Sequence, residues 1–205
     1  MFTYRTSNDH QNIKQKIYSM DDYKLLRAHM YELAETICFF IENGDFDSVL
    51  EIGPSDVNCV EKEFENYNTN IIRKTCDKYN VNYKSVDIVG NPDYKGSAEN
   101  LSEFVTEKFD VVILLGILEH VKKPYLVPKQ LYDILNDHGK CFINVPFLFK
   151  IHGPEPDCWR FTPQGLEILF DEYFDLCMSS YPENELKKNS LPLSINVLAN
   201  RKSIW

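Results

Sequence analysis

The sequence predicts an α/β sandwich, in which helices cover a mostly parallel β-sheet. Short apolar runs alternate with helix-like segments along most of the chain, and this alternation is typical of parallel sheets. The run Phe109–Leu115 is apolar almost throughout, which indicates a strand buried on both faces. A length of 205 residues fits one domain with a single core.

The first helix is expected over Asp22–Asn43, where apolar residues recur at helical spacing and Asn43-Gly44 ends the pattern. A short helix over Asn12–Tyr18 precedes it, and Ser19 or Asp21 is placed to cap the longer one. We therefore expect residues 1–45 to form a helical cap.

The next elements alternate between strand and helix. Strands are expected over Ser48–Ile52 and Val81–Ile88, with a polar helix over Glu61–Tyr79 between them. Pro92 predicts a loop after the second strand. The strand Phe109–Leu115 follows and is predicted to lie at the centre of the sheet.

The last third of the chain is predicted to hold two helices and three strands. A helix over Pro124–Leu135 and a turn at Asp137–Gly139 lead into a strand at Lys140–Pro146. Thr162 is expected to cap a second helix that begins at Pro163. The final segments, Phe174–Ser180 and Ser194–Ala199, allow an antiparallel pair.

Composition excludes two classes of protein. The formal net charge of −9 disfavours a broad basic face that would bind nucleic acid. Purely apolar stretches such as Val111–Leu115 are far below the ~20 residues of a membrane-spanning helix.

The N-terminus and the cysteines predict a cytoplasmic protein. The first residues lack the basic segment and apolar core of a secretory signal. No C-x-x-C pair occurs, so we expect most cysteines to be reduced residues of the core. The six are Cys38, Cys59, Cys76, Cys141, Cys158 and Cys177.

The ends of the predicted strands carry ligand-binding signals. Gly53 follows the first strand, where a glycine lets the backbone approach a ligand closely. Asp87 ends the second strand, where an acid accepts hydrogen bonds from ribose hydroxyls. Together they predict a ligand that contains a nucleoside.

Three segments then resemble the successive motifs of class I S-adenosylmethionine-dependent methyltransferases. They are VLEIGPSD at Val49–Asp56, VDIVGNPDYKGSAENL at Val86–Leu101 and FDVVILLGILEHV at Phe109–Val121. The resemblance implies a Rossmann-like three-layer sandwich, with a seven-stranded mostly parallel sheet that ends in an antiparallel hairpin. Residues 1–205 would then be one methyltransferase domain, with the cofactor-binding core at 46–205.

The same resemblance implies S-adenosylmethionine as cofactor, with S-adenosylhomocysteine as product. Glu51 and Gly53 would border its methionine part, Asp87 its ribose and Ser97-Ala98 its adenine, while Leu115-Gly116 would face its amino acid group. The implied cofactor-binding residues are Glu51, Gly53, Pro54, Ser55, Asp87, Ile88, Ser97, Ala98, Leu115 and Gly116.

The segment His152–Thr162 resembles an H-x-x-P-x-D-x-W-R-F-T stretch of methyltransferase-like proteins, and we expect an acceptor lid at 147–162. An imidazole takes a proton from a hydroxyl, a carboxylate orients it, and an indole packs on a sugar. His152 and Asp157 are therefore catalytic candidates, and Trp159 and Arg160 are substrate-binding candidates. The alternative is an Asp157–Arg160 ion pair with Trp159 as a packing plug.

His120, in the LEHV motif, is a third catalytic candidate, with a wall or helix-start position as its alternative. No metal site is expected, because Asp157 and His152 lack a third ligand at a diagnostic spacing. The remaining histidines, His10, His29 and His138, are expected at the surface.

The predicted function is methyl transfer to a hydroxyl or amine of a small molecule, most simply a sugar or glycan. The alternative is a degenerate binding domain, suggested by Ser55 and Ser97 where the family usually has a glycine and an acid. In that case the helix Asp22–Ile41 would present its apolar face to another subunit. A homodimer is compatible with both the enzyme and the binding domain. A nicotinamide-dependent oxidoreductase is disfavoured, because the G-x-G-x-x-G spacing is missing.

Overall fold

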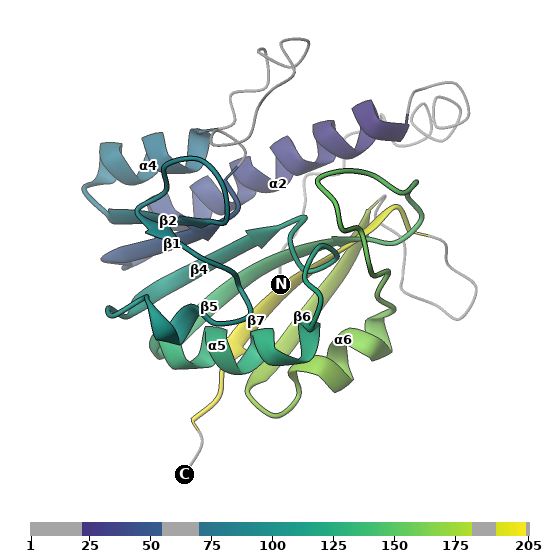
Figure 1. Ribbon diagram of the computed structural model, residues 1–205. Helices are drawn as coiled ribbons and strands as arrows, with labels where there is room; N and C mark the ends of the chain where they lie inside the picture. The colour runs from purple at the N-terminus through teal and green to yellow at the C-terminus, as the bar shows by residue number, and fades with distance from the viewer. Residues whose placement is uncertain (1–21, 55–69, 182–191, 204–205) are drawn as a thin grey trace.

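The computed structural model of the chain describes residues 22–54, 70–181 and 192–203. In these residues one β-sheet lies between two layers of helices (Figure 1). The strands are β1 (Ser48–Ile52), β2 (Asn82–Asp87), β3 (Tyr94–Lys95), β4 (Phe109–Leu115), β5 (Leu135–Pro146), β6 (Phe174–Tyr181) and β7 (Ser194–Arg201). The α-helices are α2 (Asp22–Asn43), α4 (Ile71–Tyr79), α5 (Val127–Ile134) and α6 (Pro163–Phe170).

The sheet has seven strands in the order β3-β2-β1-β4-β5-β7-β6. Strands β1 to β5 pair in parallel, whereas β7 pairs antiparallel with both β5 and β6. The predicted α/β fold with a C-terminal antiparallel hairpin is therefore confirmed. The apolar strand β4 lies at the centre, as its composition predicts.

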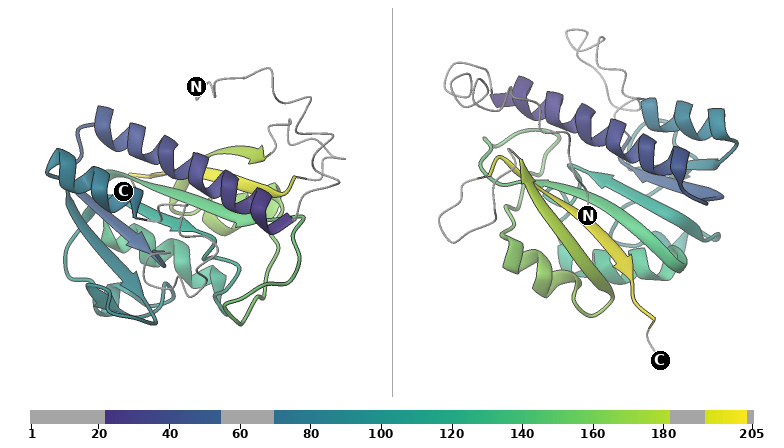
Figure 2. Two further views of the ribbon diagram at one scale, coloured as in Figure 1. Left: turned by 90° about the horizontal axis from the view of Figure 1, so that it is seen from above. Right: turned by 180° about the vertical axis from the view of Figure 1, so that it is seen from behind.

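Each face of the sheet has its own core. Helices α2 and α4 cover one face and α5 and α6 the other, which Figure 2 shows from two further directions. Successive side chains of a strand point to opposite faces. Val49 of β1 therefore belongs to the core that contains Ile37 and Ile72 under α2 and α4, whereas Leu50 belongs to the core that contains Leu131 and Phe170 on the α5 and α6 side.

One end of each of two helices agrees with the sequence-based prediction. Thr162 caps α6, because its side chain accepts a hydrogen bond from the Gly165 N–H over 3.1 Å, and Pro163 occupies the first turn. Helix α2 ends at Asn43, whose side-chain amide donates to the Phe39 carbonyl oxygen over 2.8 Å.

Two strands differ from the sequence-based prediction. The loop expected around Pro92 contains the two-residue strand β3, whose Tyr94 pairs with Val86 of β2. Strand β5 begins at Leu135, before the predicted turn, because Leu135 pairs with Phe109 while Lys140 pairs with Val111. The intervening residues form an irregularity within the strand instead of a separate turn.

Some predictions fall outside the described residues. They are the helix at 12–18, the cap of α2 at Ser19 or Asp21, and the first part of the helix at 61–79, of which α4 is the described part. Among the described cysteines, Cys38, Cys76 and Cys141 are free and buried, as expected, whereas Cys158 and Cys177 are exposed. No described helix is both long enough and apolar enough to cross a membrane.

Helix α2 is an integral layer of the core. Its residues Leu33, Ile37 and Ile41 are buried against the sheet, so this apolar face is occupied within the chain. The expectation that His29 lies at the surface is wrong. His29 is 3% exposed, stacks on Tyr181 and hydrogen-bonds Asn196 of β7 over 3.2 Å, because α2 crosses the end of the C-terminal hairpin.

Candidate active site

The predicted cofactor-binding residues of three strands lie at one edge of the sheet. In the parallel register, Ile52 of β1 lies opposite Val86 of β2 and Leu114 of β4. The next residue of each strand therefore places Gly53, Asp87 and Leu115 at the carboxyl edge. In sheets of this type, ligands bind at that edge.

The turn after β1 is tightly built. Gly53 has a φ of +68°, and a Cβ at this position would lie 2.1 Å from Cδ1 of Ile117. Its N–H donates to the Val86 carbonyl oxygen over 2.8 Å. The left-handed φ and the lack of space for a Cβ explain why this turn needs a glycine. Pro54 is buried beside it, and Ser55 lies outside the described residues.

Glu51 lies on β1, two residues before Gly53, on the face covered by α2 and α4. Its side chain is 8% exposed and accepts a hydrogen bond from the Tyr83 hydroxyl over 2.7 Å. A buried carboxylate with a bound donor has a fixed orientation. Glu51 is therefore held near the edge at which Gly53 turns the chain.

The end of β2 presents an acid and exposed apolar side chains. Asp87 is 6% exposed, and its Oδ1 accepts the Val89 N–H over 3.0 Å. Ile88 and Val89, which follow it, are 63% and 43% exposed. Exposed apolar side chains next to a buried acid suit a ligand with both a polar and a flat apolar part.

The loop that holds Ser97 and Ala98 is tied to the loop after β4. Ala98 is buried, and the Ser97 hydroxyl accepts the Glu99 N–H over 3.2 Å. The Glu99 carboxylate in turn accepts the N–H groups of Lys122 and Lys123 over 2.6 and 3.1 Å. The two loops therefore form one continuous wall.

The turn after β4 faces α2. Gly116 has a φ of +68° and donates its N–H to the Asn144 carbonyl oxygen over 3.0 Å. A Cβ on Gly116 would lie 3.4 Å from Oε1 of Glu119 and 3.9 Å from Cε of Met30 in α2. Gly116 thus lies between the Glu119 carboxylate and α2, and a Cβ at this position would contact both.

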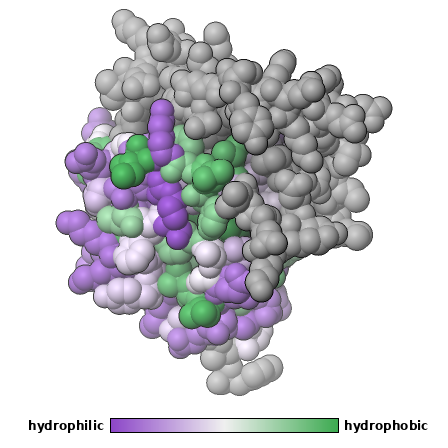
Figure 3. Space-filling view, turned by 90° about the vertical axis from the view of Figure 1, so that its right-hand side faces the viewer, coloured by the Kyte–Doolittle hydropathy of each residue, from purple (hydrophilic) through white to green (hydrophobic). Residues whose placement is uncertain are grey.

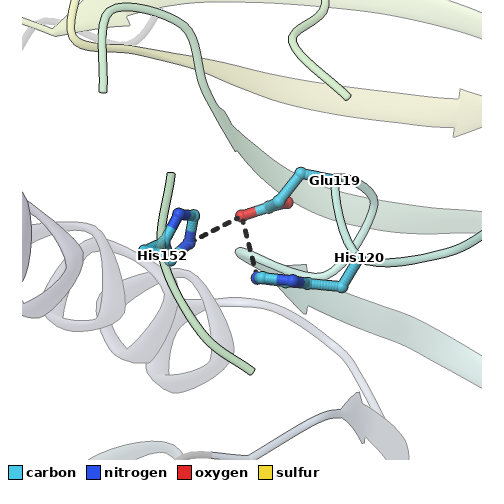
Figure 4. Close-up of side chains that lie close together, drawn as sticks. All are labelled: Glu119, His120 and His152. Carbon is cyan, nitrogen blue, oxygen red and sulfur yellow. Dashed lines mark ion pairs between the residues drawn. The ribbon is translucent and has the colours of Figure 1, made fainter. Parts of the chain in front are cut away.

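Three side chains converge at this point: Glu119, His120 and His152 (Figure 4). Oε1 of Glu119 lies 3.8 Å from Nε2 of His120 and 3.8 Å from Nε2 of His152. The two imidazole rings meet edge to face, with their centroids 4.9 Å apart. The cluster joins the loop after β4 to the predicted lid.

Glu119 is the most buried member, with 1% of its side chain exposed. Its Oε2 has no hydrogen-bond partner among the described residues. Because burial penalises the charged form, it raises the pKa of Glu119 to about 8, and the nearby charge of Asp157 adds to this effect.

Asp157 fixes the position of His152. The Asp157 carboxylate accepts the backbone N–H of His152 over 2.9 Å, and its Oδ2 lies 3.0 Å from Nδ1 of the same histidine. Hydrogen bonds from Arg160 keep the pKa of Asp157 well below its usual range. Burial lowers the pKa of His152, and the charge of Asp157 opposes this shift. His152 is therefore biased toward a neutral imidazole.

The lid is fastened to the loop after β4 by its backbone and by Trp159. The N–H groups of Cys158 and Trp159 both donate to the Glu119 carbonyl oxygen, over 2.8 and 3.3 Å. The Trp159 indole N–H donates to the Val121 carbonyl oxygen over 2.8 Å. His120 Nδ1 lies 2.9 Å from the Pro156 carbonyl oxygen.

The lid also exposes apolar surface. Leu148 is 52% exposed, Ile151 86% and Trp159 41%. Figure 3 views the side of the molecule that carries the lid and α6, and it shows hydrophobic side chains gathered among polar ones. A small acceptor with an apolar face would find contacts here.

The structure thus brings together His120, His152 and Asp157, the three catalytic candidates. The sequence analysis missed Glu119, the residue between the two histidines. The available signal was its place in the LEHV motif beside His120, directly after the central strand. Nothing in the sequence spacing connects it to His152, which lies 3.8 Å from it in space.

A comparison with known families matches residues 50–143 to a family described as a methyltransferase domain. This range contains the end of β1, all of β2, β3 and β4, most of β5 and the LEHV loop. No curated protein matches the chain significantly.

Solved structures of methyltransferases share the fold. A S-adenosylmethionine-dependent methyltransferase from Archaeoglobus fulgidus aligns with a TM-score of 0.59 at 13% identity, covering 94% of this chain and 100% of that one. The plantazolicin methyltransferase BamL, solved with S-adenosylhomocysteine, aligns at 0.56 and 10% identity, covering 94% and 90%. The glycopeptide N-methyltransferase MtfA, solved with sinefungin, aligns at 0.55 and 9% identity, covering 84% and 94%. At these identities the comparison shows a shared fold.

Proposed function

We propose that this chain is an S-adenosylmethionine-dependent methyltransferase that acts on a small molecule. The observation that carries the proposal is the alignment of Gly53, Asp87 and Leu115-Gly116 at one edge of the sheet, within the region that matches a methyltransferase domain. When bound, the cofactor supplies an electrophilic methyl group on a sulfonium.

The residues at the strand ends suit the parts of that cofactor. The buried carboxylate of Asp87 has acceptor capacity for ribose hydroxyls, and Ile88 offers an exposed apolar side chain for the adenine ring. Gly53 and Gly116 both adopt a left-handed φ, which turns the chain sharply at the strand ends where the methionine part would lie. Ser97 and Ala98 would border the adenine, and Glu51, Pro54 and Ser55 the turn beside the methionine part.

The cluster at the lid suits the acceptor. His152 is biased toward its neutral form, and Asp157 favours a proton on Nδ1, so the lone pair of Nε2 points toward Glu119 and His120. An acceptor hydroxyl placed there would give its proton to Nε2 as the oxygen attacks the methyl group. An amine acceptor would need to be aligned with the methyl group and to lose a proton at the same place.

We favour a sugar or glycan as acceptor, because the lid carries an exposed indole at Trp159 and exposed apolar side chains at Leu148 and Ile151. The net charge of −9 argues against a nucleic acid. Residues 1–205 would act as one domain with a lid at 147–162, and the free cysteines favour a cytoplasmic location.

Calorimetry with S-adenosylmethionine and S-adenosylhomocysteine tests the cofactor. Both ligands should bind, and Asp87→Ala should weaken binding about tenfold, because it removes acceptors for two ribose hydroxyls. Asp175→Ala is the matched control, since Asp175 is 78% exposed on β6. Folded protein that binds neither ligand would overturn the proposal and favour a degenerate binding domain.

The acceptor is sought with a methyl-labelled cofactor and panels of glycosides, nucleotide sugars and small amines. With an identified hydroxyl acceptor, His152→Ala should reduce kcat at least about a hundredfold, the usual contribution of a general base. Cofactor affinity should stay unchanged. His138→Ala, an exposed histidine outside the site, controls for the loss of an imidazole.

A further inference from the structure

We propose that Glu119, His120 and His152 form a binding site for a divalent transition-metal cation. Three ligand atoms, one from each side chain, lie within 4.8 Å of one another. Two of the three come from the loop after β4 and one from the lid, so a bound cation would join these two segments (Figure 4).

His120 is oriented as a metal ligand usually is, and His152 has a carboxylate beside its second ring nitrogen. A ligating imidazole donates its second ring N–H to a carbonyl or carboxylate, which fixes the tautomer and turns the other nitrogen to the metal. Nδ1 of His120 lies 2.9 Å from the Pro156 carbonyl oxygen, and Nδ1 of His152 lies 3.0 Å from Oδ2 of Asp157. The contact of His120 leaves the lone pair on its Nε2, and the negative charge of Asp157 favours the same tautomer in His152. Each Nε2 lies 3.8 Å from Oε1 of Glu119.

The carboxylate supplies an independent observation. Glu119 is 1% exposed, and its Oε2 has no hydrogen-bond partner among the described residues. Buried polar groups are normally hydrogen-bonded, and a buried carboxylate without donors is costly. A cation between Glu119 and the two histidines would compensate the carboxylate where no described protein donor does.

The ligand set indicates the type of cation. Two imidazoles and one carboxylate form the set that holds Zn²⁺ in several hydrolases and Fe²⁺ in oxygenases, with further positions left open. Mg²⁺ and Ca²⁺ prefer oxygen ligands. At metal–ligand distances of about 2.1 Å, ligand atoms lie about 3.0–3.5 Å apart, so the two 3.8 Å separations need to contract by about 0.3–0.8 Å, and the three ligand atoms, which lie within 4.8 Å of one another, need to draw together.

The role of the cation rests on the proposed function. A hydroxyl bound at an open position loses its proton more readily, because the cation stabilises the oxyanion. That proton passes to solvent water, the oxygen forms a bond to the methyl carbon, and the carbon–sulfur bond breaks to leave the neutral thioether. In the metal-loaded protein, Nε2 of His152 would bind the cation and could not accept a proton. The cation would therefore promote deprotonation of the acceptor hydroxyl in place of His152.

The test is cation binding by tag-free protein that has been stripped with a chelator. Titration with Co²⁺, followed by visible absorption, should show one equivalent bound with nitrogen and oxygen ligation, and Zn²⁺ should displace it. The absence of a saturable one-to-one signal overturns the site. S-adenosylhomocysteine binding is measured on the same sample, so failure of the cation site is distinguishable from failure of the methyltransferase proposal.

Variants identify the ligands. His152→Ala and the isosteric Glu119→Gln should each weaken Co²⁺ binding at least about tenfold, and Asp157→Asn should weaken it about 10–100-fold through the orientation of His152. His138→Ala and Cys158→Ser are the controls and should leave binding unchanged. Circular dichroism checks folding, and because Glu119 is buried, the less buried His152 supplies the decisive variant. Equal binding by His152→Ala and the controls rejects the proposal.

Discussion

The guanidinium of Arg160 binds both carboxylate oxygens of Asp157, and the Asp157 side chain is only 1% exposed. Arg160 also donates to the carbonyl oxygens of Lys150 and Trp159, over 3.0 and 2.7 Å. The Asp157–Arg160 pair therefore links two segments of the lid and holds the Asp157 carboxylate next to His152. Direct contact of Arg160 with an acceptor stays a prediction.

Asp157→Asn should lower the free energy of unfolding by about 2 kcal/mol, because it leaves Arg160 without its charge partner. Arg160 is 25% exposed, so the loss is smaller than for a fully buried pair. Asp137→Asn is the matched control: it breaks an Asp–Arg pair with Arg201 whose carboxylate is 87% exposed, and should cost less than about 1 kcal/mol. Urea denaturation measures both, and equal losses would contradict the structural importance of the lid pair.

Gly53→Ala should lower stability by about 1–3 kcal/mol and weaken S-adenosylhomocysteine binding. The left-handed φ of +68° disfavours a side chain, and the new Cβ would meet Ile117. Gly153→Ala is the control, since a Cβ at that position would have no atom within 4 Å and the φ of Gly153 is not left-handed. Thermal unfolding with and without ligand measures both effects. Equal behaviour of the two variants would show that the turn after β1 tolerates a side chain.

His29 should make stability depend on pH below neutrality. Burial lowers its pKa from 6.5 to about 4, so the unfolded chain binds a proton that the folded chain does not. Relative to His29→Gln, the wild-type protein should lose stability as the pH falls from about 6.5 toward 4, by at most about 1.4 kcal/mol per pH unit. The difference should be constant above pH 7. Urea denaturation across this range measures it, and a difference that does not change with pH between 4 and 7 would contradict the buried neutral state of His29.

Trp159→Phe should lower stability by about 1 kcal/mol, because it removes the indole donor to the Val121 carbonyl oxygen while keeping an aromatic ring. Hydrogen exchange should then be faster at the Cys158 and Trp159 amides, which donate to Glu119. Unchanged exchange and stability would show that the lid is held by its backbone contacts alone, and would favour an acceptor-binding role for the indole.

The sequence predicted the core of the sheet well, because burial on both faces leaves a strong signal. The bounds of β1 and β4 agree with the prediction, since each is a short apolar run ended by a glycine turn. Strand β3 was missed, because a strand of only two residues, Tyr94 and Lys95, shows no periodicity in the sequence. It is held in place by Asp93, whose carboxylate accepts the backbone N–H and hydroxyl of Ser85, each over 2.9 Å.

The site was predicted in part for a similar reason. Motifs at strand ends predicted that Gly53, Asp87 and Gly116 lie at one edge, because parallel register is fixed by the sheet. Glu119 and His29 depend on contacts between distant segments. Glu119 gains its surroundings from the lid, and His29 from Tyr181 and Asn196 of the C-terminal hairpin, so local sequence carries little information on either.

One residue links the architecture of the lid to the chemistry beneath it. The main chain of Glu119 receives the lid at Cys158 and Trp159, while its side chain meets His120 and His152. An engineer who grafts a new lid must therefore keep His152 and the Cys158–Arg160 end, whereas the exposed side chains of Leu148 and Ile151 are open to exchange. The side chains of Leu148 and Ile151 can thus be varied while the residues that fasten the lid and reach Glu119 stay in place.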